Sequence, residues 1–211
     1  MQIEKIKINE LGYPFLLSQI HNPPKELYVL GNKEILREKS IAIVGCRNCT
    51  SYGVKVTREL AYNLSRRNII TVSGLAKGID TYCHIGTILV KGRTIAVVAH
   101  GLDMIYPAEN RNLAKKIIEC GGAIVSEYDV GTKPLKEHFP ARNRIISGLA
   151  EKIVIVEAGE KSGALITADF ALEQGRDVYA IPGNIFSEKS IGTNKLIKQG
   201  ANLLSGYEEL L

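Results

Sequence analysis

Short apolar runs rich in β-branched residues alternate along the chain with longer segments whose apolar residues recur at helical spacing. The runs are apolar throughout rather than alternating, which is typical of parallel strands covered on both faces. Six strands are predicted in this way, over residues 41–45, 69–73, 94–99, 122–127, 152–157 and 177–182.

Five helical segments separate these strands, over residues 51–68, 78–92, 109–121, 141–150 and 162–175. In the first segment, Val56, Leu60 and Leu64 lie on one face with polar residues opposite. Gly121 and Gly175 end the third and fifth segments, as expected where helices stop. The alternation predicts an α/β fold with a doubly wound, mostly parallel sheet and helices on both faces.

The two ends of the chain follow a different pattern. Residues 1–38 carry prolines and look irregular, so we expect a lead-in segment packed on a main domain that spans residues 39–211. Past Pro182, the pattern indicates one or two short helices. We therefore expect one domain with short additions at its ends.

Composition narrows the class of protein only a little. The 211 residues are 45% hydrophobic and 23% charged, which is ordinary for a globular protein. No apolar run approaches the roughly 20 residues that span a bilayer, and no signal peptide is seen, so we expect a cytoplasmic protein. The net charge of +5 permits a polyanionic partner without requiring one.

Cys46 and Cys49 form a Cys-x-x-Cys motif directly after the first predicted strand. Such a pair can be a redox or metal site, but a structural zinc would need two more ligands, and Cys83–His84 is the only nearby pairing. The other interpretation is an anion-binding turn, because backbone N–H groups point outward where a parallel strand leads into a helix. Arg47 adds a planar fork suited to phosphate, with a surface salt bridge as its alternative role, and Ser51 begins the helix.

Further loops at the carboxyl ends of the strands carry side chains suited to phosphate. These candidates are Ser73, Gly74, Arg142, Asn143, Arg144, Lys161, Ser162, Gly163, Asn194 and Lys195. Arg142–Asn143–Arg144 is predicted at a helix start, where cations oppose the helix dipole, so a bound anion would remove a conflict. A solvated first turn is the alternative for this triplet, as an exposed lysine is for Lys195.

No catalytic constellation stands out. His84 lies within a helical segment and is expected to pack, while His100 and His138 have no evident nucleophile partner. We expect no catalytic residue, no metal and no cofactor.

Several stretches together carry a family likeness. They are IAIVGCRNCTSYG, TVSGLAKGIDTYCH, GLDMIYPAEN, the segment from GAIVSEYDVG to FPARNRIISGLA, the segment from IVIVEAGEKSGALITADF to AIPGN, and SIGTNKLIKQGA. On these motifs the chain resembles the DNA-processing protein A (DprA/Smf) family from about Tyr13 to Leu204. Cys46 and Cys83 stand where that family usually has small residues, so the Cys-x-x-Cys is interpreted as incidental. A winged-helix domain found in many members is not expected here.

The resemblance implies an extended Rossmann-like fold and a homodimer that binds single-stranded DNA without catalysis. It also implies that the protein protects incoming DNA during natural transformation and helps to load the recombinase RecA. Arg47 and Lys161 are then expected to contact phosphates, and Ser162, Gly163, Asn194 and Lys195 to line the same pocket. Arg142 and Arg144 could instead hold the fold together through carboxylates. Because aromatic residues are few, backbone contacts are expected to outweigh base stacking.

The alternative is a nucleotide-processing enzyme of the lysine-decarboxylase-like phosphoribohydrolase type, which has a similar sheet. Those enzymes carry a Pro-Gly-Gly-x-Gly-Thr-x-x-Glu stretch whose glutamate is catalytic. The corresponding stretch here, residues 157–168, reads EAGEKSGALITA and lacks both the Gly-Gly pair and that glutamate. A regulatory module for a small nucleotide is the third possibility, and binding of a free nucleotide would favour it.

Overall fold

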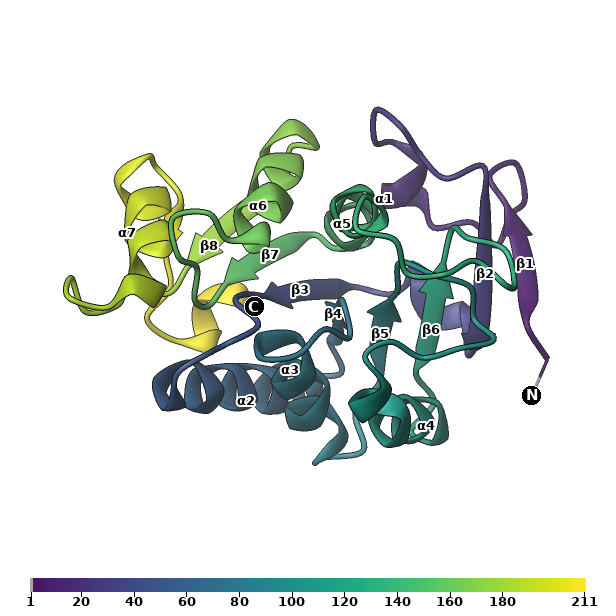
Figure 1. Cartoon of the computed structure of the whole chain (residues 1–211), viewed down its shortest axis with the longest axis horizontal. Helices are drawn as coiled ribbons and strands as arrows, with labels where there is room; N and C mark the ends of the chain where they lie inside the picture. The colour runs from purple at the N-terminus through teal and green to yellow at the C-terminus, as the bar shows by residue number, and fades with distance from the viewer. Residues whose placement is uncertain (1) are drawn as a thin grey trace.

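One mixed sheet organises the molecule, and the computed structural model describes it over residues 2–211 (Figure 1). The strands are β1 (Glu4–Lys7), β2 (Glu26–Gly31), β3 (Ser40–Val44), β4 (Ile70–Ser73), β5 (Thr94–Val97), β6 (Ala123–Ser126), β7 (Lys152–Ile155), β8 (Asp177–Ala180) and β9 (Asn202–Leu203). The α-helices are α1 (Phe15–Ser18), α2 (Ser51–Arg66), α3 (Ile79–Ile88), α4 (Arg111–Glu119), α5 (His138–Leu149), α6 (Gly163–Glu173) and α7 (Ile191–Lys198). Short 3₁₀ helices are η1 (Lys33–Arg37), η2 (Ala108–Asn110), η3 (Glu188–Ser190) and η4 (Tyr207–Leu210). The six predicted strands are confirmed as β3 to β8.

The strand order is β1-β2-β6-β5-β4-β3-β7-β8-β9. Neighbouring strands from β6 across to β9 are parallel, whereas β2 runs antiparallel to both β1 and β6. From β3 the chain adds β4, β5 and β6 on one side and later adds β7, β8 and β9 on the other. This doubly wound, Rossmann-like order places a topological switch point between β3 and β7, where ligands bind in open α/β sheets.

Helices cover both faces of this sheet, with α2, α3 and α4 on one face and α1, α5 and α6 on the other (Figure 1). Alternate residues of β3 point to opposite faces, as strand geometry requires. Ile41 and Ile43 pack with Leu60 of α2, while Ala42 and Val44 join the core formed with α5 and α6. All five residues of β3 are buried, which explains its unbroken apolar run.

The lead-in segment was expected to be irregular, and this expectation is wrong in part. It adds β1 and β2 to the sheet, and Val29 of β2 pairs with Val125 of β6. It also buries Leu17 in the core beside α5. The sequence signal was weak because β2 follows a proline pair and its partner β6 lies about a hundred residues further along the chain.

The start of α5 also differs from the prediction. The helix begins at His138 rather than near Ala141, and it includes Pro140 in its first turn. Proline is tolerated there because the N–H it lacks would have no intrahelical partner. Arg142 and Arg144 therefore lie in the second turn, where the helix dipole no longer opposes their charge, so the expected anion between them is not required.

Along residues 2–211, none of the helices combines the length and the apolar character that a membrane span requires.

Candidate functional site

A cleft of about 720 Å³ opens at the carboxyl edge of the sheet, at the switch point between β3 and β7. Its walls come from the loop after β3, the start of α5 with the loop before it, and the loop between β7 and α6. Six of the residues predicted from the sequence line it: Arg47, Arg142, Asn143, Lys161, Ser162 and Gly163. Segments more than a hundred residues apart thus converge on one cavity.

Glu157 shapes the loop after β3. Its carboxylate accepts hydrogen bonds from the Thr50 backbone N–H (2.9 Å) and the Thr50 hydroxyl (2.5 Å), and its backbone carbonyl accepts from the Cys46 N–H (2.8 Å). Thr50 is also the N-cap of α2, because its Oγ1 accepts from the Gly53 N–H. A Cβ at Gly53 would lie 2.4 Å from a Glu157 oxygen, so a side chain there would displace the Glu157 carboxylate.

The two cysteines of the motif are held as thiols. Burial and the Glu157 carboxylate raise the pKa of Cys46 to about 12, and burial raises the pKa of Cys49. The Cys46 thiol donates to the Asn48 carbonyl (3.4 Å) and faces a Glu157 oxygen at 3.6 Å. A reactive redox pair would need a lowered thiol pKa, so this environment favours the interpretation of the motif as part of the turn. Residues 2–211 contain no cluster of three or more side chains that could hold a metal ion.

Gly78 brings the loop before α3 against the loop after β3. It has a positive φ of 77°, and a Cβ there would lie 2.4 Å from the carbonyl oxygens of Cys46 and Arg47. The Ile79 N–H donates to the Cys46 carbonyl at 3.3 Å. These contacts hold Arg47 at the mouth of the cleft, where its side chain is exposed.

Cations and aromatic rings meet at this mouth. The Arg47 guanidinium lies over the Phe139 ring, 5.3 Å from its centroid, and Phe139 in turn packs against Tyr106 with centroids 5.9 Å apart. Both rings line the cleft. The sequence analysis did not connect either ring with the cleft, and the expectation that backbone contacts outweigh stacking there stays a prediction.

The α6 side of the cleft is built around a helix start. Ser162 is the N-cap of α6, and its Oγ accepts from the Ala164 N–H at 3.4 Å. Asn143 of α5 donates to the Gly163 carbonyl at 3.2 Å, which joins the two helices at the cleft. Lys161 is exposed beside them. Backbone N–H groups at such a helix start together with a lysine are suited to bind an anion.

Arg142 lies at the floor of the cleft and is only 4% exposed. Its Nη1 donates to the Gly74 carbonyl (2.6 Å) and to the Val97 carbonyl, so it ties the ends of β4 and β5 to α5. Burial lowers the pKa of Arg142 to about 10 and raises the pKa of the nearby Asp80. Its hydrogen bonds serve the fold, although through backbone carbonyls rather than through the carboxylates that the sequence analysis considered.

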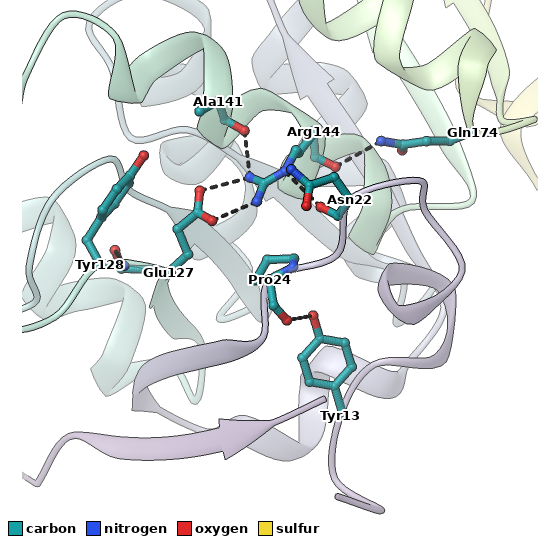
Figure 2. Close-up of polar contacts among 9 residues, drawn as sticks. Tyr13, Asn22, Pro24, Glu127, Tyr128, Ala141, Arg144 and Gln174 are labelled. Carbon is teal, nitrogen blue, oxygen red and sulfur yellow. Dashed lines mark hydrogen bonds and ion pairs between the residues drawn. The ribbon is translucent and has the colours of Figure 1, made fainter. Parts of the chain in front are cut away.

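Arg144 is not among the residues that line the cleft, and Figure 2 shows its guanidinium directed at Glu127 and Asn22. It forms a bidentate ion pair with Glu127 (2.7 and 2.8 Å), and its Nε donates to the Asn22 carbonyl at 2.9 Å. The Arg144 carbonyl accepts from Gln174 of α6 at 3.1 Å. Arg144 thus links α5 to the lead-in segment and to the residues that follow β6 and α6, which is the structural role that the sequence analysis gave as its alternative.

Other predicted residues also lie outside the cleft. Ser73 is fully buried and donates to the Ile43 carbonyl at 2.7 Å. Asn194 of α7 is paired in both directions with the Gly183 backbone (3.0 and 3.1 Å), and Lys195 is exposed on the same helix. Ser51 lines a separate groove along α2. Gly74 lines a small cavity next to the cleft, where a Cβ would collide with Arg142.

Sequence reasoning missed the other four cationic and aromatic residues of the cleft: Lys136, Lys189, Tyr106 and Phe139. Lys189 reaches the site because η3 is held to the β7–α6 loop by the hydrogen bond from the Ala158 N–H to its carbonyl (2.8 Å). Lys136 and Phe139 flank the start of α5, which was predicted a few residues too late. The available signal was the proline in the run HFP before Ala141, because proline is common in the first turn of a helix.

The fold and the cleft define a class: a Rossmann-like α/β protein with a cation-lined cleft at the switch point of its sheet. The family model described as DNA recombination-mediator protein A matches residues 4–211. DNA processing protein DprA of Bacillus subtilis is 46% identical over 209 residues, which is 99% of this chain and 70% of that protein. The chain belongs to the DprA/Smf family, as the sequence motifs indicated.

Two solved structures agree with this assignment. The X-ray structure of DprA from Streptococcus pneumoniae superposes with a TM-score of 0.93 at 41% identity, covering 99% of this chain and 73% of that chain. DprA from Helicobacter pylori, whose structure is described for its single-stranded DNA binding mode, gives a TM-score of 0.90 at 30% identity, covering 99% and 94%.

Proposed function

We propose that this protein binds single-stranded DNA in the cleft at the switch point and acts as a mediator of DNA recombination rather than as an enzyme. The observation that carries the proposal is the meeting of Arg47, Lys136, Lys161 and Lys189 with the exposed face of Tyr106 and with Phe139 in one cleft. Proteins that bind single strands combine cations that contact the phosphate backbone with aromatic rings that stack on the bases. Family membership and the single-stranded DNA binding of the Helicobacter pylori relative support the same conclusion.

The side chains of the cleft have different roles in this proposal. Arg47 and Lys161 neutralise phosphates from opposite walls, and the α6 start adds backbone N–H donors. Tyr106 and Phe139 accept a base by stacking, which carries little sequence preference. Arg142 stabilises the floor of the cleft through its hydrogen bonds to the Gly74 and Val97 carbonyls.

The wider role is part of the proposal. It includes a cytoplasmic homodimer that protects incoming DNA in natural transformation and helps to load RecA onto it. A dimer supports this role because two clefts on one strand raise affinity through effective concentration. The family's description as recombination mediators supports the partnership with a recombinase.

Anisotropy titration of a fluorescent oligo-dT tests the binding site. We expect wild type to prefer the oligonucleotide to a duplex and to a mononucleotide, and Arg47→Ala/Lys161→Ala to lose about tenfold or more in affinity because two phosphate contacts disappear. The matched control is Lys195→Ala/Lys198→Ala, which removes the same charge from exposed positions on α7 outside the cleft. It should bind like wild type.

Two results would contradict the proposal. Equal binding by wild type and the cleft variant would place the DNA elsewhere. Binding of the mononucleotide alone would favour a nucleotide-processing enzyme or a regulatory module.

A further inference from the structure

The outward face of α2 carries a regular basic stripe. Ser51, Lys55, Arg58, Tyr62 and Arg66 recur every three or four residues, so they lie on one side of the helix. All but Tyr62, which is half-buried, are exposed. The opposite side of α2 packs on the core through buried residues such as Leu60 and Leu64. The stripe is therefore not required by the packing of the helix.

A shallow groove of about 530 Å³ runs along this stripe. Ser51, Lys55, Arg58 and Tyr62 line it together with Leu89, which follows α3 and is 56% exposed. Arg66 lies beyond, with its guanidinium 6.0 Å from the centroid of the Tyr62 ring. The surface thus combines cations, an aromatic ring and an apolar contact, as surfaces that bind single-stranded nucleic acid do.

The cations of the stripe have no carboxylate partner among the ion pairs of residues 2–211. Glu59 is the one acidic residue that lines the groove, against Lys55 and Arg58. By contrast, Lys77 beside the cleft is paired with Glu109 at 2.5 Å. Unneutralised cations in a groove favour a polyanion, because contact with phosphates releases counterions.

The stripe begins next to the cleft along the chain. Arg47 and Asn48 line the cleft, and Ser51, three residues further on, lines the groove. From there α2 extends for 16 residues, or about 24 Å, away from the cleft. A strand that leaves the cleft past Arg47 can therefore continue onto the basic face of α2.

We propose that the α2 groove is a second section of the binding site, which takes the continuation of a single strand held in the cleft. Lys55 and Arg58 contact its phosphates, and Tyr62 offers a stacking surface. This inference rests on the proposed binding of single-stranded DNA in the cleft, and it adds that affinity grows with strand length.

Anisotropy with a short oligo-dT of roughly six nucleotides and a long one of roughly twenty separates the two sections, because single-strand sites of this kind span about 4 to 16 nucleotides. We expect Lys55→Ala/Arg58→Ala to bind the short strand like wild type and to lose about tenfold on the long one, with the slope of log K against log salt reduced by about 1.4. Alanine at exposed helix positions preserves α2. The control, Lys115→Ala/Lys116→Ala on the exposed face of α4, removes the same charge and should change neither affinity.

The outcomes distinguish the two proposals. Unchanged affinity of the Lys55/Arg58 variant for the long strand would overturn the inference, and so would an equal loss on both strands. If the α4 control lost affinity for the long strand equally, the effect would come from net charge alone, and this would also overturn the inference. If wild type fails to bind the short strand at all, the cleft proposal fails instead.

Discussion

Arg142 and Arg144 lie two positions apart on α5, yet their guanidinium groups meet different surroundings. Arg142 points under the cleft and donates to the carbonyls of Gly74 and Val97, whereas Arg144 points to the lead-in segment and Glu127. Successive helical positions differ by about 100°, so a local triplet cannot place both on one ligand. The protonation of His84 likewise depends on the residues that pack around it rather than on its neighbours in sequence.

His84 gives a prediction about pH. Burial, with a smaller contribution from the positive charge of Arg142, lowers the pKa of this fully buried histidine from 6.5 to about 3. The unfolded chain then binds a proton below about pH 6.5 that the folded chain does not, so stability is full above that pH and is lost as pH falls toward 3. We expect wild type to lose roughly 2–3 kcal/mol more than His84→Gln between about pH 6.5 and 4.5, from about 1.4 kcal/mol per pH unit for one proton.

Urea denaturation of both proteins at a series of pH values measures this difference. The His84→Gln protein should be less stable near neutral pH, because it disturbs the contact between the His84 Nδ1 and the Thr94 hydroxyl (2.8 Å). Its curve of stability against pH should nevertheless be flatter. Parallel curves for the two proteins would show that His84 does not titrate in this way.

At the scale of elements, the lead-in segment contributes two strands to the sheet rather than only packing on the main domain. The strand β2 pairs with β6 and β1 forms the edge beyond it, and Tyr13 donates to the Pro24 carbonyl (2.7 Å) just before β2 (Figure 2). Arg144 is the polar link from this segment to α5, with its side chain 12% exposed and that of Glu127 17% exposed. An ion pair so shielded and bidentate contributes more than an exposed one.

Arg144→Lys tests that link. A lysine keeps the charge but cannot form the bidentate pair with Glu127 while also donating to the Asn22 carbonyl. We expect a loss of about 2 kcal/mol in stability and faster hydrogen exchange in residues 10–25. The matched control is Arg37→Lys, which alters an exposed pair with Glu34 whose side chains are 48% and 59% exposed, and it should change neither measurement. Faster exchange in both variants, or in neither, would contradict a structural role for Arg144.

At the scale of the molecule, the strand order creates the cleft. Because β3 lies between β4 and β7, the loops that follow β3 and β7 separate toward opposite faces and leave a crevice between them. Five cations gather there, four of them besides the buried Arg142 of the floor, although the whole chain carries a net charge of only +5. Binding strength then depends on where the charges lie more than on their sum.

The salt dependence of binding follows from this count. If Arg47, Lys136, Lys161 and Lys189 each neutralise one phosphate of a short oligo-dT, the slope of log K against log salt is about −2.8. Removing Lys136, which the sequence analysis overlooked, by Lys136→Ala should reduce the slope to about −2.1. A slope near zero, or no effect of Lys136→Ala on it, would show that these cations do not contact the strand. Anisotropy titrations at several salt concentrations provide the values.

Hydrophobic patterning by itself determined the six central strands, the helices between them and the α/β class, because these depend on the local spacing of apolar residues. The motifs determined the family, and loop chemistry identified Arg47 and Lys161. Tertiary structure alone decided which polar residues share a site. It drew Arg144 and Asn194 into structural hydrogen bonds and brought Lys189 and Tyr106 into the cleft. The reason is physical, because the period of a helix or strand is set by residues close together in the sequence. Which loops meet depends instead on strand pairings such as β3 with β7, whose residues lie about a hundred positions apart.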